Sequence, residues 1–172
     1  MYEINFKKLI IKRLILFMAL LMPHTHVTAS SINATMQVSA TVVSNCQLND
    51  PTMQFGTYDA SSNNDNALHA VGSLQIRCTK FTTAMIALNN GEHSYQAIGT
   101  TRAMSNSSGN DFLSYDLYTN SNYNSIWNNT NNIDYISSSS GFNTVNIYGK
   151  IPANQNVKNG VYRDTIVVTA NF

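Results

Sequence analysis

The last twelve residues, 161–172, read VYRDTIVVTANF and alternate between apolar and polar side chains. One face of the extended chain would carry Ile166, Val168, Ala170 and Phe172. This period of two is typical of a β-strand with one buried face. From Thr165 onward the segment has no charged residue and no proline, with which proteins usually protect a strand at the edge of a sheet. We therefore expect another part of the chain, or another chain, to cover it.

A second alternating stretch lies at residues 32–43, which read INATMQVSATVV. Its apolar row consists of Ile32, Ala34, Met36, Val38, Ala40 and Val42. Twelve residues are about twice the usual length of a strand. We expect residues 37–43 to form the first strand of the domain, which leaves the first half of the stretch without an obvious partner. The alternative is one long first strand that switches between two sheets.

The residues before this stretch have the three-part order of a secretory signal peptide. Lys7, Lys8, Lys12 and Arg13 come first. A nine-residue apolar run at 14–22 follows, and small residues end the pattern at Ala29. The run is much shorter than the ~20 apolar residues that a membrane-spanning helix needs. We expect residues 1–29 to be cleaved, leaving one exported domain of 143 residues with no membrane span.

The composition of this mature chain excludes several classes of function. Six basic and eight acidic residues give a net charge of −2, whereas binding to nucleic acid needs clustered basic charge. There is no GxSxG nucleophile motif and no evident pair of carboxylates. We therefore expect no catalytic residues, no cofactor and no enzymatic activity.

The mature chain has two cysteines, Cys46 and Cys78. An even number of cysteines in an exported protein favours a disulfide. Free thiols or metal ligands are the alternatives, but His69 and His93 show no recognisable ligand spacing, so we expect no metal site.

Short strand-like segments recur through the rest of the chain. They lie at residues 53–59, 72–78, 83–88, 112–119 and 143–151. Turn signals separate them, including Asn89-Asn90-Gly91 and Asn159-Gly160. Many short strands with regular turns predict an all-β sandwich.

Seven motifs along the chain occur in the order seen in the spore coat protein U domain. They are VSATVVSNCQL, FGTYD, GSLQIRCTK, IALNNG, LSYDLYT, YGKIPANQNV and GVYRDTIVVTANF. From about residue 36 to the end, the chain therefore resembles this family, which includes the pilins of archaic chaperone–usher pili. The resemblance implies an incomplete immunoglobulin-like sandwich with six strands, whose missing last strand leaves an apolar groove. It also implies a disulfide between Cys46 on the first strand and Cys78 on the second.

The resemblance further implies assembly by donor-strand exchange, in which the N-terminal extension of another pilin subunit fills the groove. A periplasmic chaperone would occupy the groove first, and the exchange would take place at an outer-membrane usher. Residues 30–36 would then be the donor extension and residues 37–172 the pilin domain. The expected donor side chains are Ile32, Ala34, Met36 and Val38. The expected acceptor and chaperone-binding strand carries Ile166, Val168, Ala170 and Phe172.

These expectations describe a structural pilin that is exported to the periplasm and then reaches the cell surface, where it serves attachment and biofilm formation. Two alternatives remain. The same domain could be a coat protein secreted to a spore or cell surface, or a stand-alone binding module that fills its own groove.

Overall fold

The computed structural model describes residues 27–61 and 66–172. The chain divides into two units, Met1–Ala40 and Thr41–Phe172. The expected signal peptide lies outside the described residues except for positions 27–29. Residues 27–45 contain no strand, and every one of them is exposed.

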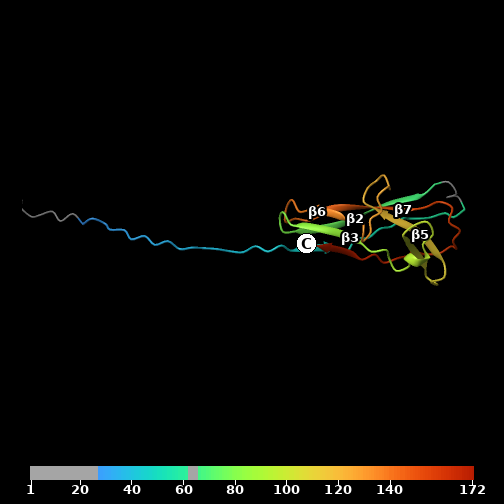
Figure 1. Cartoon of the computed structure of the whole chain (residues 1–172), viewed down its shortest axis with the longest axis horizontal. Helices are drawn as coiled ribbons and strands as arrows, with labels where there is room; N and C mark the ends of the chain where they lie inside the picture. The colour runs from blue at the N-terminus through green and yellow to red at the C-terminus, as the bar shows by residue number, and fades with distance from the viewer. Residues whose placement is uncertain (1–26, 62–65) are drawn as a thin grey trace, which may run out of the picture. The chain divides into compact units, whose positions relative to one another are not determined.

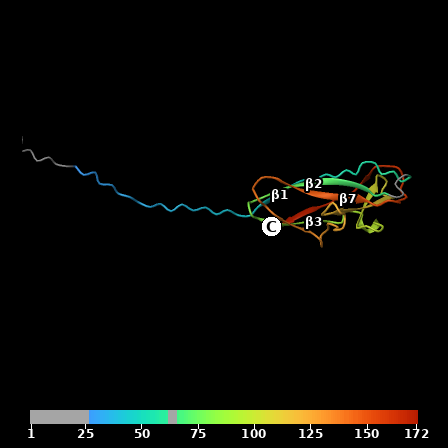
Figure 2. The ribbon, with the colours of Figure 1, turned by 90° about the horizontal axis from the view of Figure 1, so that it is seen from above.

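The second unit is built from two antiparallel sheets (Figure 1). The larger sheet has the order β1 (Cys46–Asn49), β2 (Leu68–Cys78), β7 (Asn143–Ile151), β5 (Phe112–Tyr118), β4 (Arg102–Asn106) and β8 (Tyr162–Arg163). The smaller sheet has the order β6 (Ile133–Ile136), β3 (Thr83–Leu88) and β9 (Val168–Asn171). A 3-10 turn, η2, spans Ser94–Gln96. Figure 2 shows β2 and β7 in one layer and β3 in the other. The prediction of an all-β, immunoglobulin-like sandwich is confirmed.

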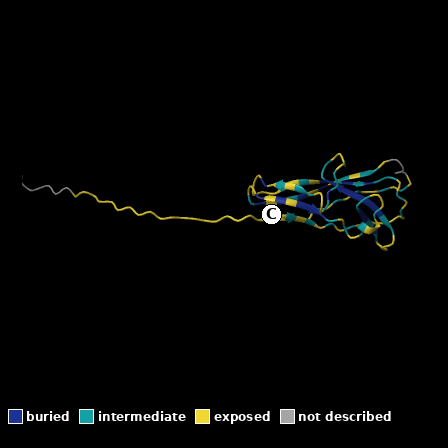
Figure 3. Ribbon diagram, viewed as in Figure 1, coloured by how far each residue is buried: buried dark blue, intermediate teal, exposed yellow. Residues whose placement is uncertain are grey.

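Alternating side chains from the two sheets form the core. Along β2 the even-numbered residues from Gly72 to Cys78 are buried, whereas most of their neighbours are exposed. Leu74 and Ile76 of β2 and Ile86 and Leu88 of β3 belong to the same buried cluster. Figure 3 shows such buried positions within the strands of the second unit.

The strands differ from those expected in their number. The resemblance implies six strands, whereas the described residues contain nine. Short strands β4 and β6 were not predicted, and the expected terminal strand is divided into β8 and β9. The division arises because the chain changes sheets, since β8 pairs with β4 and β9 pairs with β3.

The prediction that residues 37–43 form the first strand is wrong for this chain, because that strand begins at Cys46. Cys46 lies opposite Cys78, which is the last residue of β2. A strand over residues 37–43 would extend past the end of β2, which is the only strand that pairs with β1 in the described part of the chain. Beyond Cys78 the ladder is continued by Thr79 alone, whose N–H and hydroxyl donate to the carbonyls of Asn45 and Val43.

Candidate functional site

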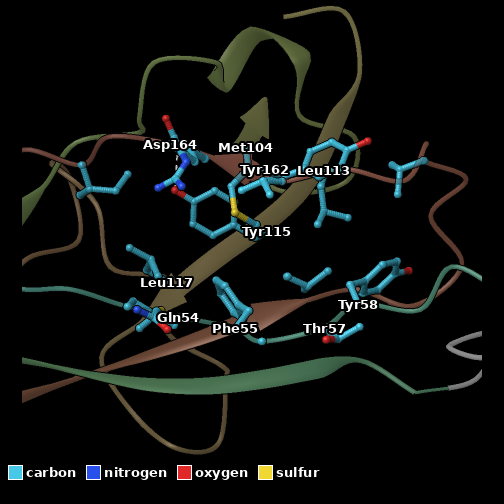
Figure 4. Close-up of a pocket in the computed structure, with 18 of the residues that line it drawn as sticks. Gln54, Phe55, Thr57, Tyr58, Met104, Leu113, Tyr115, Leu117, Tyr162 and Asp164 are labelled. Carbon is cyan, nitrogen blue, oxygen red and sulfur yellow. Dashed lines mark hydrogen bonds between the residues drawn. The ribbon is translucent and has the colours of Figure 1, made fainter. Parts of the chain in front are cut away.

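A groove with a volume of about 1250 Å³ lies between the two sheets (Figure 4). Its floor is formed by core side chains that a complete sandwich would enclose. They are Leu88 of β3, Met104 of β4, Leu113, Tyr115 and Leu117 of β5, and Ile147 and Ile151 of β7. Two chain segments border the groove: residues 51–61, which we call the first rim, and residues 157–168, which we call the second rim.

The first rim is an extended chain whose side chains alternate in direction although it belongs to no strand. Met53 and Phe55 are half-buried, and their neighbours Thr52 and Gln54 are exposed. Within the described part of the chain, residues 51–58 make no backbone–backbone hydrogen bond. The prediction of a strand at 53–59 is therefore wrong, but the alternation that suggested it is real. Backbone donors and acceptors of residues 51–58 remain available to a further strand.

Two glycines of the larger sheet make room for the side chains of the first rim. A Cβ atom on Gly149 would lie 2.5 Å from Sδ of Met53 and 2.6 Å from Cζ of Phe55. A Cβ atom on Gly72 would lie 3.1 Å from Cε of Met53. Met53 and Phe55 therefore pack directly on the backbone of β2 and β7.

The second rim is fixed to the sandwich on one side. Both the N–H of Lys158 and the hydroxyl of Tyr162 donate to Oδ2 of Asp111, at 2.6 and 2.7 Å. Burial and this hydrogen bond raise the pKa of Tyr162 to about 12, so the phenol remains a donor at neutral pH. Farther along, β9 pairs with β3, from Leu88–Val168 to Met85–Asn171. Since β9 is the outer strand of its sheet, its other edge has no strand partner among the described residues.

A chain of contacts crosses the groove from one rim to the other. The rings of Phe55 and Tyr115 meet edge to face, with centroids 5.9 Å apart and an interplanar angle of 71°. The hydroxyl of Tyr115 donates to Oδ2 of Asp164 at 2.7 Å. Oδ1 of Asp164 accepts the N–H of Glu92 at 2.9 Å. Burial, followed by the nearby charge of Asp164, raises the pKa of Tyr115, which keeps this phenol protonated.

A fully buried arginine supports the floor behind Tyr115. Nε and Nη2 of Arg102 donate to the carbonyl of Asn89 at 3.0 and 2.7 Å, and Nη2 also donates to the carbonyl of Trp127 at 2.7 Å. Burial is the largest effect and lowers the pKa of Arg102. Tyr115 and the carboxylates of Asp116 and Asp164 oppose this shift but do not cancel it. The arrangement holds the β3–η2 connection and the loop around Trp127 against β4.

The expected acceptor residues fall into two pairs. Ile166 and Val168 line the groove. The lining does not include Ala170 or Phe172. Ala170 lies opposite Ile86 in the β9–β3 ladder, and Phe172 is 57% exposed at the end of the chain. Sequence reasoning did not identify Met53, Phe55, Tyr115, Asp164 or Arg102 as parts of a site. The alternation at 53–58 and a lone arginine beside Ala103 and Met104 were the available signals.

The expected donor residues lie in the first unit and are open to solvent. The exposed fractions of Ile32, Met36 and Val38 are 99%, 85% and 81%. Ala34 is exposed as well. Their role as donors stays a prediction.

A disulfide joins Cys46 to Cys78, which are direct partners across β1 and β2. Within residues 27–61 and 66–172, no three His, Cys, Asp or Glu side chains gather as metal ligands. No helix in the described part of the chain is long and apolar enough to span a membrane.

Comparisons with known proteins relate this fold to spore coat and pilus proteins. The model of the Spore Coat Protein U domain matches residues 32–169. Protein U of Myxococcus xanthus is 34% identical over 157 residues, which cover 84% of this chain and 87% of that protein.

Among solved structures, one match is to the complex of the chaperone CsuC with the tip adhesion subunit CsuE from archaic chaperone–usher Csu pili of Acinetobacter baumannii. The TM-score is 0.50 at 25% sequence identity, and the match covers 77% of this chain. It spans only 41% of the length of the matched chain. With a family model that matches most of its length, the protein belongs to the Spore Coat Protein U domain family.

Proposed function

We propose that this protein is a structural subunit of a chaperone–usher pilus, which polymerises by donor-strand exchange and serves surface attachment and biofilm formation. The observation that carries the proposal is the groove between the first and second rims, whose floor consists of core side chains. Family membership and the likeness to a chaperone–adhesion subunit complex of pili support it.

The two rims offer what an added strand requires. Strand addition uses main-chain hydrogen bonds for affinity and alternating side-chain pockets for specificity. Residues 51–58 have unpaired backbone groups, and the outer edge of β9 has no strand partner among the described residues. An occupant would also cover Ile166 and Val168 with an apolar row of its own.

The exposed alternating stretch at residues 30–38 supplies such a row to another copy. A contact in which the N-terminal segment of one copy fills the groove of the next is heterologous and does not close on itself. It therefore propagates a fibre. Before assembly a periplasmic chaperone would occupy the same groove, and an outer-membrane usher would release it. Because the chaperone is periplasmic and the usher lies in the outer membrane, we also propose that the protein is exported through a cleaved signal peptide.

Deletion of residues 30–38 tests this function. The shortened chain is expected to remain bound to its chaperone but to form no polymer, as measured by gel filtration with light scattering of the exported protein. A matched pair of variants separates side-chain recognition from segment length. Replacing Ile32, Met36 and Val38 with asparagine should abolish polymerisation, whereas alanine at Asn33, Thr35 and Gln37 on the opposite face should preserve it. Fibres formed by the deletion chain would refute the assignment of the donor.

A coat protein of a spore or cell surface is the second candidate, because the model of the Spore Coat Protein U domain matches residues 32–169 and Protein U matches over 87% of its length. Electron microscopy of producing cells distinguishes the two functions, since a pilin gives thin filaments and a coat protein gives a continuous layer. A third outcome, a stable monomer that neither polymerises nor binds a chaperone, would indicate a binding module that fills its own groove.

A further inference from the structure

We propose that Phe55 and Tyr115 set a size limit at the centre of the groove, and that Ala34 of the incoming copy is the residue that satisfies it. The inference rests on the proposed function, because it assumes that residues 30–38 of a second copy occupy the groove. It adds a register and a specificity-determining pair to that function.

The limit arises where the first rim touches the floor. With their centroids 5.9 Å apart in an edge-to-face arrangement, the rings of Phe55 and Tyr115 are in contact, so no side chain can pass between them. Tyr115 is only 4% exposed, and its hydroxyl is held by Asp164, so the ring cannot easily turn away. Phe55 is held from below by the backbone at Gly149. An occupant must cross above this pair of rings.

The floor on either side of the rings is aliphatic and follows the strand period. Leu113, Tyr115 and Leu117 are successive inward-facing residues of β5, and all three line the groove. Figure 4 shows Leu113 on one side of Tyr115 and Leu117 on the other. Residues two apart on a strand are about 6.6–6.8 Å apart, and the side chains of an added strand have the same spacing. The floor therefore presents the bulky pair of rings at its centre and a smaller leucine on either side.

The N-terminal row has the complementary profile. Ile32 and Met36 are large and flank Ala34, which is small. Packing places small residues opposite large ones, so Ala34 belongs above Phe55 and Tyr115, with Ile32 and Met36 above the two leucines. Because Ala34 is the central member of the three, the assignment holds whichever way the added segment runs.

The same row contains a second alanine, Ala40, which provides a matched control. Ala34→Phe and Ala40→Phe are made in the full-length chain, and the ratio of polymer to monomer in the exported protein is measured by gel filtration with light scattering. Overpacking at one position typically reduces an association constant by about tenfold or more. We expect this reduction for Ala34→Phe and an unchanged ratio for Ala40→Phe. Both positions are exposed, so neither change should alter the fold.

The double variant Ala34→Phe/Phe55→Ala tests whether the limit lies at the rings. Every copy carries both changes, so each enlarged donor meets an enlarged groove, and polymerisation should return. If fluorescence of Trp127 shows that Phe55→Ala is unfolded, Phe55→Leu takes its place. Normal assembly of Ala34→Phe, an equal block by Ala40→Phe, or a block that neither Phe55 variant relieves would overturn the inference. If the chain without residues 30–38 still fails to polymerise, each of these outcomes would refute the size limit but not the proposed function.

Discussion

At the scale of single residues, Arg102 is the least expected feature of the fold. It is completely buried, and its guanidinium binds backbone carbonyls of two separate loops, at Asn89 and Trp127. A cation in this position satisfies several acceptors at once, which a neutral side chain of the same length cannot do. Its removal therefore leaves buried carbonyl oxygens without donors.

Arg102→Met is expected to lower the free energy of unfolding by about 3 kcal/mol, because charged hydrogen bonds are lost while the side-chain volume is largely kept. Urea denaturation followed by the fluorescence of Trp127, the only tryptophan, measures the change. Arg163→Met on the exposed side of β8 is the control and should change stability by less than about 0.5 kcal/mol. Equal losses in the two variants would show that the carbonyl contacts do not stabilise the fold.

Asp111 makes the second rim sensitive to acid. The hydroxyl of Tyr162, and then the N–H of Lys158, hold the pKa of Asp111 below its ordinary value of 3.8. A carboxylate with a lowered folded-state pKa stabilises the fold above its unfolded pKa, and this contribution is lost as the pH falls through the folded value. Wild type should therefore be more stable than Asp111→Ala at neutral pH, and the difference should shrink below pH 3.8.

Unfolding free energies of the two proteins, measured from about pH 6 to about pH 3, test this dependence. Asp134→Ala, which removes an exposed carboxylate from β6, controls for the loss of one negative charge. A difference between wild type and Asp111→Ala that stays constant over this range would contradict the assigned hydrogen bonds.

At the scale of elements, the first rim depends on glycine in the neighbouring strands. Gly149→Ala is expected to reduce stability by about 1–3 kcal/mol, because the new methyl group would displace Met53 and Phe55. Gly141→Ala is the matched control, since its Cβ would meet only Oγ of Ser139 at 3.6 Å. Thermal unfolding of both variants measures the effect. Alanine is ordinarily better than glycine in a strand, so a gain in stability for Gly149→Ala would disprove the close packing.

Alternation in the sequence was sufficient to locate the regular strands but not their partners. The expected segments 83–88 and 143–151 coincide with β3 and β7, because apolar residues of both strands face one core. Residues 37–43 alternate equally well, yet they form no strand, because β2 ends at Cys78. A pattern of side chains reports which face is apolar, whereas a strand also needs a neighbouring backbone.

The groove was predictable only in part for a similar reason. Ile166 and Val168 were identified because they lie on an apolar strand with no evident cover. Phe55, Tyr115 and Asp164 lie far apart in the sequence and meet only when the two rims are folded. Arg102 and β4 escaped prediction, because the five-residue strand begins with an arginine and contains only two apolar residues, Ala103 and Met104.

At the scale of the whole molecule, the proposed contact has one donor and one acceptor on each copy, and this asymmetry governs the length of the fibre. A chain without residues 30–38 retains the groove but has no segment to offer. It can therefore join a growing polymer at one end only and stop further growth there.

Mixing this shortened chain with the intact chain is expected to shorten the polymers in proportion to its share. One shortened chain for about every twenty intact chains should reduce the mean length to about twenty subunits. Electron microscopy of the mixture measures the lengths, and the same amount of additional intact chain is the control. An isologous contact closes into dimers and would give no fibres in either preparation, and a layered coat would lose area rather than length. Only a head-to-tail strand contact gives shorter fibres whose number rises with the amount of the shortened chain.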